Sequence, residues 1–363
     1  MFIQRIINAP LSFRRLPPLS TVVLASVVVL APADAATKPP LDAGAINAAE
    51  WRDGKLPPDK ISPLIIKAQV LLARARFSPG EIDGRPGENY KKALRTYAGQ
   101  NGGGGTDQLN AELWQKLAAT SSDPVATEYT ITSDDVAGPF VKKLPKKFEA
   151  LKDLPRLSYT SARELIAEKF QMSEELLAAL NPGKKFDEAG VAITVLNVSS
   201  AKLPARVARV EIDKDTQMLR AFAPDGALLA AYPITAGSAE KPTPSGTLKV
   251  TSINKNPTYR YNPAYAFKGV KSRKPFTIKP GPNNPVGVVW IALSSEGVGI
   301  HGSPEPGKIS KTESHGCIRM TNWDVSQLAA SLTKGVQVEF SGTGREALAQ
   351  SKDRKEPARR ARK

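Results

Sequence analysis

The segment 301-HGSPEPGKISKTESHGCIRM-320 contains both histidines of this chain, His301 and His315, together with its single cysteine, Cys317. Coincidence is a poor explanation for such a cluster in a chain of 363 residues. A lone cysteine is most often a buried, inert residue, but this one stands in a polar loop between Ser-His-Gly and Ile-Arg. The segment therefore predicts that Cys317 carries out chemistry.

Cys317 is a candidate nucleophile, because a thiolate attacks a carbonyl carbon once a neighbouring imidazole has taken its proton. His301 follows the apolar run Val-Gly-Ile, which predicts a strand end, and a base supplied by a separate element is the commoner arrangement. His315, two residues from the thiol, is the other candidate base. The amides of Gly316 and Cys317 are placed to stabilise an oxyanion, and Arg319 supplies a cation for the thiolate or for a substrate carboxylate.

A zinc site is an alternative use of the same side chains. His301, His315 and Cys317 are three suitable ligands, and three protein ligands plus water is a known catalytic pattern. An acidic side chain from the same region would complete a closed site.

The first 35 residues predict export. Arginines precede an apolar run from Leu19 to Leu30, and Ala33-Asp34-Ala35 is typical of signal-peptidase cleavage. A membrane anchor is the alternative, but a span needs about 20 apolar residues and this run is shorter. We expect cleavage after Ala35 and a mature protein in the periplasm or at the cell wall. With one cysteine, an exported chain has no internal disulfide framework.

The formal net charge is +16, which favours an acidic partner. Nucleic acid fits badly, because the chain is predicted to be exported, aromatic residues make up 6% of it, and no nucleic-acid-binding motif is found. An anionic cell-wall polymer is the better candidate. A charged surface with no particular partner is the alternative for most of the lysines.

Several domains are predicted from the length and the changes in composition. Residues 36–58 are a predicted linker, and apolar positions at helical spacing predict a three-helix bundle over 59–120. This bundle resembles the helical peptidoglycan-binding module, although the insert QNGGGGTDQ replaces the module's tighter connector. A generic three-helix bundle is the alternative. The residues that match the module's pattern are Gln69, Gly80, Asp83, Gly84, Gly87, Ala93, Trp114 and Leu117.

Residues 121–156 are predicted to be a connector and 157–199 a second module. Tyr159 is expected to begin a short strand, Ser161 and Ser173 to cap two helices, and VAITVL to return as a strand.

This β-α-α-β order, with Asn181 after the second helix, is similar to a LysM glycan-binding module. The Gly-Asp pair that usually precedes the first helix is replaced by Ala162-Arg163. Glycan binding and a retained spacer are therefore both open.

Residues 204–341 read as short strands separated by Gly and Pro. Asp225-Gly226 predicts a hairpin, and Thr321 with Asp324 predicts the start of a helix. Residues 342–363 form a basic tail that is predicted to be disordered.

Residues 204–341 resemble the catalytic domain of the L,D-transpeptidases of the YkuD type. The family signature is a His, a spacer of about a dozen residues, then Ser-His-Gly-Cys, an apolar residue and Arg or Asn, which is matched from His301 to Arg319. Thr243-Pro244-x-Gly246 and GPNNPVGVVWIAL match two further segments of the family.

The resemblance implies a multidomain protein whose catalytic domain is mainly β, with a mixed, β-sandwich-like sheet. It would act on peptidoglycan stem peptides without metal or cofactor. Cys317 would attack the third residue of a tetrapeptide stem and release D-alanine. His301 would be general base and acid, oriented by the backbone carbonyl of Gly302, and Gly316 would contribute to the oxyanion hole. The residues implied to bind substrate are Ser314, His315 and Arg319.

An amine would then take the acyl group, either from a second stem in a 3→3 cross-link or from a lipoprotein. Two other functions stay open. Hydrolysis of the same acyl-enzyme would make an L,D-carboxypeptidase or an endopeptidase. A wall-binding scaffold without turnover is the non-enzymatic alternative, and an unreactive Cys317 would indicate it.

Overall fold

The computed structural model describes residues 41–54, 60–198, 202–238, 241–265, 270–314 and 316–343. The predicted leader, part of the predicted linker and nearly all of the predicted basic tail lie outside these ranges, as does His315. Among the described residues, no helix is both long enough and apolar enough to cross a membrane.

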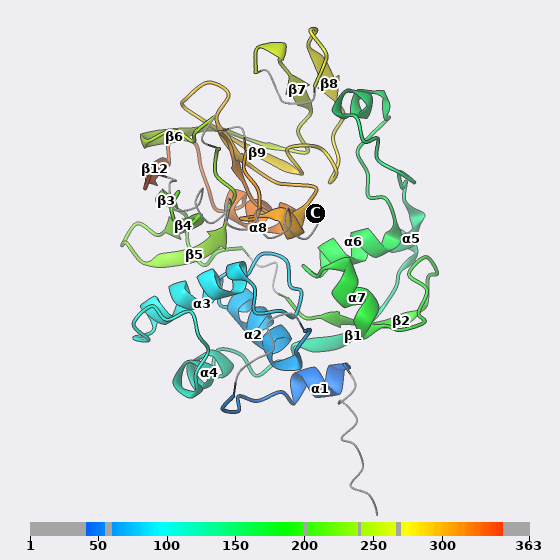
Figure 1. Cartoon of the computed structure of the whole chain (residues 1–363), viewed down its shortest axis with the longest axis vertical. Helices are drawn as coiled ribbons and strands as arrows, with labels where there is room; N and C mark the ends of the chain where they lie inside the picture. Colours follow the sequence, from blue (N-terminus) through cyan, green and yellow to red (C-terminus); the bar gives the residue numbers. More distant parts are fainter. Residues whose placement is uncertain are drawn as a thin grey trace, which may run out of the picture. The chain divides into compact units, whose positions relative to one another are not determined.

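The first of two hydrophobic cores lies between Ile46 and Leu196 and is built mainly from helices (Figure 1). The helices are α1 (Ala43–Asn47), α2 (Pro63–Arg74), α3 (Glu88–Gln100), α4 (Ala111–Ala118), α5 (Ser133–Ala137), α6 (Ala162–Lys169) and α7 (Glu174–Leu180), with the 3-10 helix η1 (Phe148–Asp153). Two antiparallel strands, β1 (Ala126–Thr130) and β2 (Ala192–Leu196), complete it.

The helices α2, α3 and α4 agree with the three predicted over 59–120. The residues of the predicted motif do come together: Gln69, in α2, donates to Asp83 Oδ1 at 3.0 Å and accepts from the amide of Gly84 at 2.8 Å. Gly84 has φ +71°, and a Cβ there would lie 2.9 Å from side-chain carbons of Ile61 and Ile66. The glycine is required by the turn and by the close packing beneath it.

The strand predicted at Tyr159 is absent, since this residue lies in an irregular segment. The partner of β2 is instead β1, which falls within 121–156, the predicted connector. A strand has no local signal for its partner, so an isolated apolar tyrosine near a helix start was a poor guide to the pairing. The domain limits at 59–120 and 157–199 stay predictions, because both segments contribute to one core.

The helix caps predicted for this region are confirmed. The hydroxyl of Ser161 accepts from the Glu164 amide at 3.1 Å, and that of Ser173 accepts from the Leu176 amide at 3.0 Å. Asn181 ends α7 and joins it to β2, through hydrogen bonds of 2.8 and 2.6 Å with the backbone of Thr194.

The second core, between Leu203 and Phe340, is built mainly from strands. The strands are β3 (Arg209–Asp213), β4 (Met218–Phe222), β5 (Leu228–Pro233), β6 (Gly246–Lys255), β7 (Tyr259–Tyr261), β8 (Phe276–Ile278), β9 (Val289–Leu293), β10 (Gly299–His301), β11 (Ile318–Arg319) and β12 (Gln337–Ser341). The helices are α8 (Asn322–Ala329) and the 3-10 turns η2 (Pro263–Tyr265) and η3 (Pro306–Lys308).

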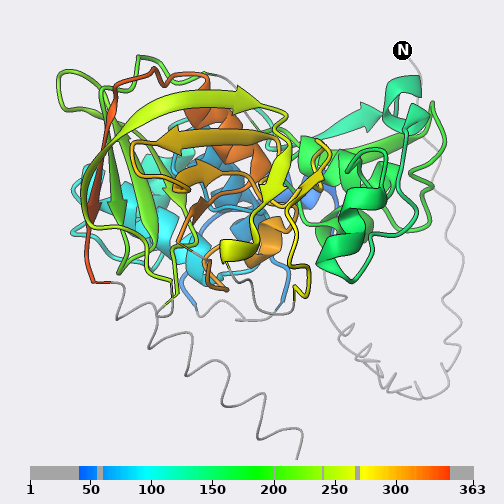
Figure 2. The same cartoon turned by 90° about the horizontal axis from the view of Figure 1, so that it is seen from above.

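Within the described residues, one mixed sheet has the order β11-β10-β9-β6-β12-β3-β4-β5. The pairs β10–β11 and β12–β3 are parallel and the others antiparallel. The long strand β6 pairs with β12 along its first half and with β9 along its second, with a bulge between Val250 and Ser252. Figure 2 shows this strand, in yellow-green, bending along its length. A bulge bends its strand and increases the local twist, so β6 lets one sheet curl around the core. The hairpin predicted at Asp225-Gly226 joins β4 to β5.

A short segment from the first core covers the β5 edge of this sheet. Phe77 forms a parallel bridge with Ala231, and the two flanking backbone hydrogen bonds, from Ser78 N and to Arg76 O, are both 2.9 Å. An uncovered edge strand exposes unpaired backbone groups. The helical part is therefore joined to the sheet by backbone pairing.

Candidate active site

The two halves of the sequence signature meet at the β11 edge of the sheet. The parallel pairing of β10 with β11 places His301 opposite Arg319 and Ile300 opposite Ile318. The close packing of β10 against β9 depends on Gly299, because a Cβ there would lie 2.6 Å from the ring of Trp290 in β9. The long loop between the histidine and the cysteine therefore closes on itself by strand pairing.

The side chain of His301 is held on two sides. It is 4% exposed, its ring stacks on Trp290 with centroids 5.5 Å apart, and its Nδ1 lies 2.7 Å from the carbonyl oxygen of Gly302. A carbonyl oxygen only accepts, so Nδ1 carries the proton and Nε2 keeps its lone pair. Burial, with a smaller contribution from the nearby positive charge of Arg319, lowers the pKa of His301 to about 3. The imidazole is therefore neutral at neutral pH, as a general base must be.

Cys317 comes directly before β11 and is partly exposed. Its Sγ lies 3.4 Å from the carbonyl oxygen of Gly297, so the thiol proton points to the backbone rather than to His301 in this structure. Burial raises the pKa of this thiol, opposed by a hydrogen bond from the Gly299 backbone and by the charge of Arg319. The cysteine is a thiol at rest and needs a base before it can attack.

The turn that presents Cys317 is tied together by Ser314. Its hydroxyl donates to the Cys317 carbonyl at 2.5 Å and accepts from the Gly316 amide at 3.1 Å. Ser314 is 2% exposed, which places it inside the loop rather than on a substrate surface. Gly316 has φ +109°, a conformation that favours glycine. Because its amide is engaged by Ser314, its predicted role toward an oxyanion requires that this bond open.

The predicted Thr-Pro-x-Gly turn supports the same loop from the other side. Thr243 donates through Oγ1 to the Gly316 carbonyl at 3.1 Å and accepts from the Gly237 amide at 2.7 Å. A parallel bridge between Gly237 and Ser314 runs beside it. Two segments far apart in the sequence thus hold the backbone of the nucleophile.

Comparison with known proteins assigns a family to this part of the chain. Residues 208–340 match the family model described as YkuD, an L,D-transpeptidase catalytic domain. This part of the chain is an L,D-transpeptidase catalytic domain. The enzymatic activity that goes with it is L,D-transpeptidation, with a role in the cell wall.

Similar proteins include the L,D-transpeptidase named YkuD of Bacillus licheniformis, 29% identical over 181 residues, which are 49% of this chain and 92% of that protein. The L,D-transpeptidase named YbiS of Escherichia coli K12 is 28% identical over 187 residues, 50% of this chain and 60% of that protein. A solved L,D-transpeptidase from Mycobacterium smegmatis has a TM-score of 0.31 and 19% identity, over 42% of this chain and 64% of that one.

Arg319 of the L,D-transpeptidase domain is largely withdrawn from solvent. Its Nη1 donates to the carbonyl of Glu313 at 3.3 Å, and burial lowers its pKa, opposed by the thiol of Cys317 and by Glu305 and Tyr259. The guanidinium stays charged at neutral pH. Its charge favours both the thiolate and the neutral imidazole, which are the forms that the reaction uses.

His315 lies outside the described residues, so its predicted substrate role stays a prediction. The same holds for the zinc alternative, which includes it. Among the described residues, no three His, Cys, Asp or Glu side chains are grouped as a metal site would require.

Sequence reasoning missed Asn322, the first residue of α8. Its side chain is 2% exposed, accepts from the Val288 amide at 3.2 Å and donates to the carboxylate of Glu168 in α6. A Cβ on Gly302 would lie 2.2 Å from Asn322 Oδ1, so the amide packs directly against the residue that orients His301. No signal for it is present in the sequence, because Asn322 stands among other polar residues, between the capping Thr321 and Asp324.

The loop from η3 to Cys317 also rests on the first core. Asn89 donates to the Ile309 carbonyl at 3.0 Å, and a Cβ on Gly307 would lie 2.8 Å from the carboxylate of Glu81. Burial raises the pKa of Glu81 to about 7, partly offset by the charge of Lys311. The helical bundle therefore supports the loop that carries the signature.

Proposed function

We propose that Cys317 of this enzyme is acylated by a peptidoglycan tetrapeptide stem and passes the acyl group to an amine. The observation that carries the proposal is the neutral His301, oriented by Gly302 and paired through β10 to the strand that follows Cys317. A base with a free Nε2 and a thiol on an adjacent strand are the two parts of a cysteine acyltransferase.

In the first half of the reaction, Nε2 of His301 takes the thiol proton while sulfur forms a bond to the carbonyl carbon of the third stem residue. The bond to D-alanine then breaks, and the imidazolium gives its proton to the leaving amine. Burial disfavours the charged imidazolium, so it exists only between taking the thiol proton and giving that proton to the leaving amine. The positive charge of Arg319 stabilises the thiolate that forms in this step.

In the second half, an acceptor amine attacks the thioester. His301 takes a proton from the amine as the new carbon–nitrogen bond forms, the carbon–sulfur bond breaks, and the thiol is restored. Amides at the Gly316–Cys317 turn would stabilise both oxyanions, an effect typically worth about 3 to 4 kcal/mol for each donor. The acceptor is a second stem or a lipoprotein lysine. No metal or cofactor takes part.

We also propose that the enzyme works outside the cytoplasm, in the periplasm or at the cell wall. The charged and apolar leader and the cleavage pattern at Ala35 support this. The helical bundle and the LysM-like module would hold the enzyme on peptidoglycan. The network between Gln69, Asp83 and Gly84 and the contact of Asn181 with β2 support these two module assignments.

Mass spectrometry of the purified chain with disaccharide-tetrapeptide tests the reaction. Cross-linked dimers with loss of D-alanine, absent for Cys317→Ala, are expected. Tripeptide without dimers would identify a carboxypeptidase instead. Unchanged substrate in both samples, with a reference enzyme active under the same conditions, would favour the alternative function of a wall-binding scaffold without turnover.

A further inference from the structure

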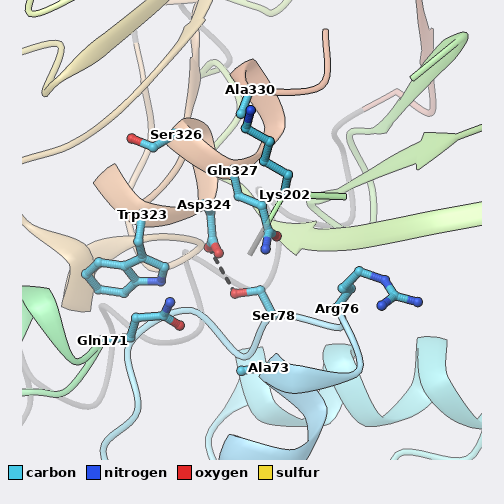
Figure 3. A pocket seen from close by; sticks show the side chains of 10 residues that line it. All are labelled: Ala73, Arg76, Ser78, Gln171, Lys202, Trp323, Asp324, Ser326, Gln327 and Ala330. Atoms are coloured by element: carbon cyan, nitrogen blue, oxygen red, sulfur yellow. Dashed lines mark hydrogen bonds between the residues drawn. The ribbon is translucent and has the colours of Figure 1, made fainter. Parts of the chain in front are cut away.

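A pocket of about 180 Å³, which Cys317 does not line, lies where the end of α2, the end of α6 and α8 meet (Figure 3). Its polar lining includes Arg76, Ser78, Gln171, Lys202, Trp323 and Asp324. Sites for drug-sized ligands are usually larger, about 300–1,000 Å³. A pocket of this size, open to solvent on one side, holds the charged end and one ring face of a small polar molecule rather than a whole drug-sized ligand.

The charge of the pocket is positive. Arg76 uses Nε for the Leu229 carbonyl at 3.0 Å, which leaves the rest of the guanidinium for other acceptors. In the described part of the chain no acidic side chain forms an ion pair with Arg76 or with the exposed Lys202. Asp324 accepts from Ser78 at 2.9 Å, and even ionised it balances one of the two cations. The pocket therefore favours an anion.

Two lining residues occupy backbone positions that usually hold glycine. Arg76 follows α2 with φ +68°, and Gln171 follows α6 with φ +56°. A residue with a Cβ pays about 1–2 kcal/mol for the left-handed conformation, and helices commonly end on glycine there. Glycine does stand at the nearby positive-φ positions Gly80 and Gly84. Long polar side chains are thus kept at two strained positions that border the same pocket, as is typical of functional sites.

The remaining groups suit a sugar. Figure 3 shows the indole of Trp323 next to the Gln171 amide, with Gln327 and Lys202 across from them. Nε1 of Trp323 is buried and has no hydrogen-bond partner among the described residues. Indole, amide and hydroxyl groups beside a flat apolar ring offer the neutral hydrogen bonds and the contact face that a sugar ring uses. An inorganic phosphate would use the two cations but would leave the indole and the amide without a contact.

We propose that this pocket binds a saccharide that carries a carboxylate, with Arg76 and Lys202 on the carboxylate and Gln171 and Trp323 on the ring. The site is separate from Cys317 and does not depend on its activity.

The test uses N-acetylmuramic acid and N-acetylglucosamine as probes, which differ by the lactyl carboxylate. NMR titration of the full chain carrying Cys317→Ala separates binding from turnover. We expect N-acetylmuramic acid to bind at least about tenfold more tightly, as one charged hydrogen bond would provide. Equal affinity, or no binding of either sugar, would overturn the proposal.

Glycine variants separate ligand binding from a structural role. Arg76→Gly and Gln171→Gly relieve the backbone, so we expect an unchanged or higher Tm together with about tenfold weaker binding of N-acetylmuramic acid. Gln217→Gly is the matched control, because Gln217 has φ +52° and does not line the pocket. It should raise Tm without changing affinity.

Arg76→Gly also removes the hydrogen bond to the Leu229 carbonyl, and this loss can lower Tm. Lys202→Gln therefore tests the same site without that loss. The lysine makes no hydrogen bond to another described residue that its loss would break, so its folding should be unaffected and its binding weakened about tenfold. Full affinity in both Gln171→Gly and Lys202→Gln would contradict the site.

Discussion

The carboxylate of Glu168, in α6, lies 3.1 and 3.2 Å from the side-chain nitrogen of Asn322, at the start of α8. Asn322 packs in turn against Gly302, whose carbonyl orients the imidazole of His301. A carboxylate in the first core thus lies three contacts from the catalytic base. Burial raises the pKa of Glu168 to about 7, opposed by its hydrogen bonds with Asn322 and Tyr159.

Glu168→Ala should lower kcat while KM changes little, because Asn322 loses the group that orients it. It should also destabilise the fold by about 1–3 kcal/mol, the usual effect of leaving buried donors unpaired. Steady-state transpeptidation and thermal unfolding measure the two effects. Glu188→Ala is the control, since Glu188 is 53% exposed and pairs with Lys185 at the surface. Equal kcat in both variants would show that the contact between Glu168 and Asn322 does not affect His301.

Gly302→Ala should reduce kcat by about 10- to 100-fold, the range expected when a catalytic group moves by about 1 Å. The added Cβ would lie 2.2 Å from Asn322 Oδ1, so either the amide or the Gly302 backbone must shift. Gly99→Ala, in the last turn of α3 with open space around it, should instead stabilise the chain by up to about 0.5–1 kcal/mol. Comparing kcat and Tm of the two variants checks the expectation. Wild-type kcat in Gly302→Ala would be inconsistent with this role of the carbonyl.

The rate of Cys317 acylation should not fall between pH 7 and pH 5. His301 has a pKa lowered to about 3, so it stays neutral and able to accept a proton throughout this window, whereas an ordinary histidine would be protonated below 6.5. Stopped-flow acylation by a carbapenem gives the profile. Arg319→Met removes a charge that lowers the pKa of His301, so its acid limb should move to higher pH. A wild-type limb near 6.5 would refute the prediction.

Asp324→Asn should remove a pH-dependent loss of stability. Burial raises the pKa of Asp324 from 3.8 to about 7, opposed by hydrogen bonds from Thr321 and Ser78. The folded state therefore binds more protons than the unfolded state between those values, and this carboxyl contributes stability that is present below pH 3.8 and lost toward pH 7. The variant should lack this slope, which approaches about 1.4 kcal/mol per pH unit.

Urea unfolding at several pH values measures the slope. His301 acts in the opposite direction, because a lowered base pKa makes stability fall as pH falls from 6.5 toward 3. The difference between wild type and Asp324→Asn cancels this shared contribution. A constant difference from pH 4 to 7 would mean that Asp324 titrates normally in the folded chain.

Much of the fold was predictable from local signals. Helix caps at Ser161, Ser173 and Thr321 accept from the expected amides, because capping depends on residues three positions apart. The hairpin at Asp225-Gly226 follows from the turn residues alone. The strand expected at Tyr159 was wrong, since the true partner of β2 lies more than 60 residues before it in the sequence. Pairing over such distances depends on the whole core.

Thr321 and Asp324, which predicted the start of α8, have the spacing of a capping box, a pair of reciprocal side-chain-to-backbone hydrogen bonds, and only one of the two bonds forms. Thr321 accepts from the Asp324 amide at 3.1 Å, but the Asp324 carboxylate bonds Ser78 of the first core at 2.9 Å. The buried Asp324 carboxylate therefore accepts from the hydroxyls of Thr321 and of the distant Ser78 rather than from the Thr321 amide.

The sequence by itself determined the chemistry: which thiol and which imidazole are present, how they are spaced, and that a carbonyl follows His301 at once. These properties belong to residue types and to chain order. Only the tertiary structure decided the states of these groups and what holds them. The neutral His301, the protonated Cys317 and the support from Asn322 and Glu168 all arise from burial and from contacts between distant segments. A sequence does not display such contacts until the chain has folded.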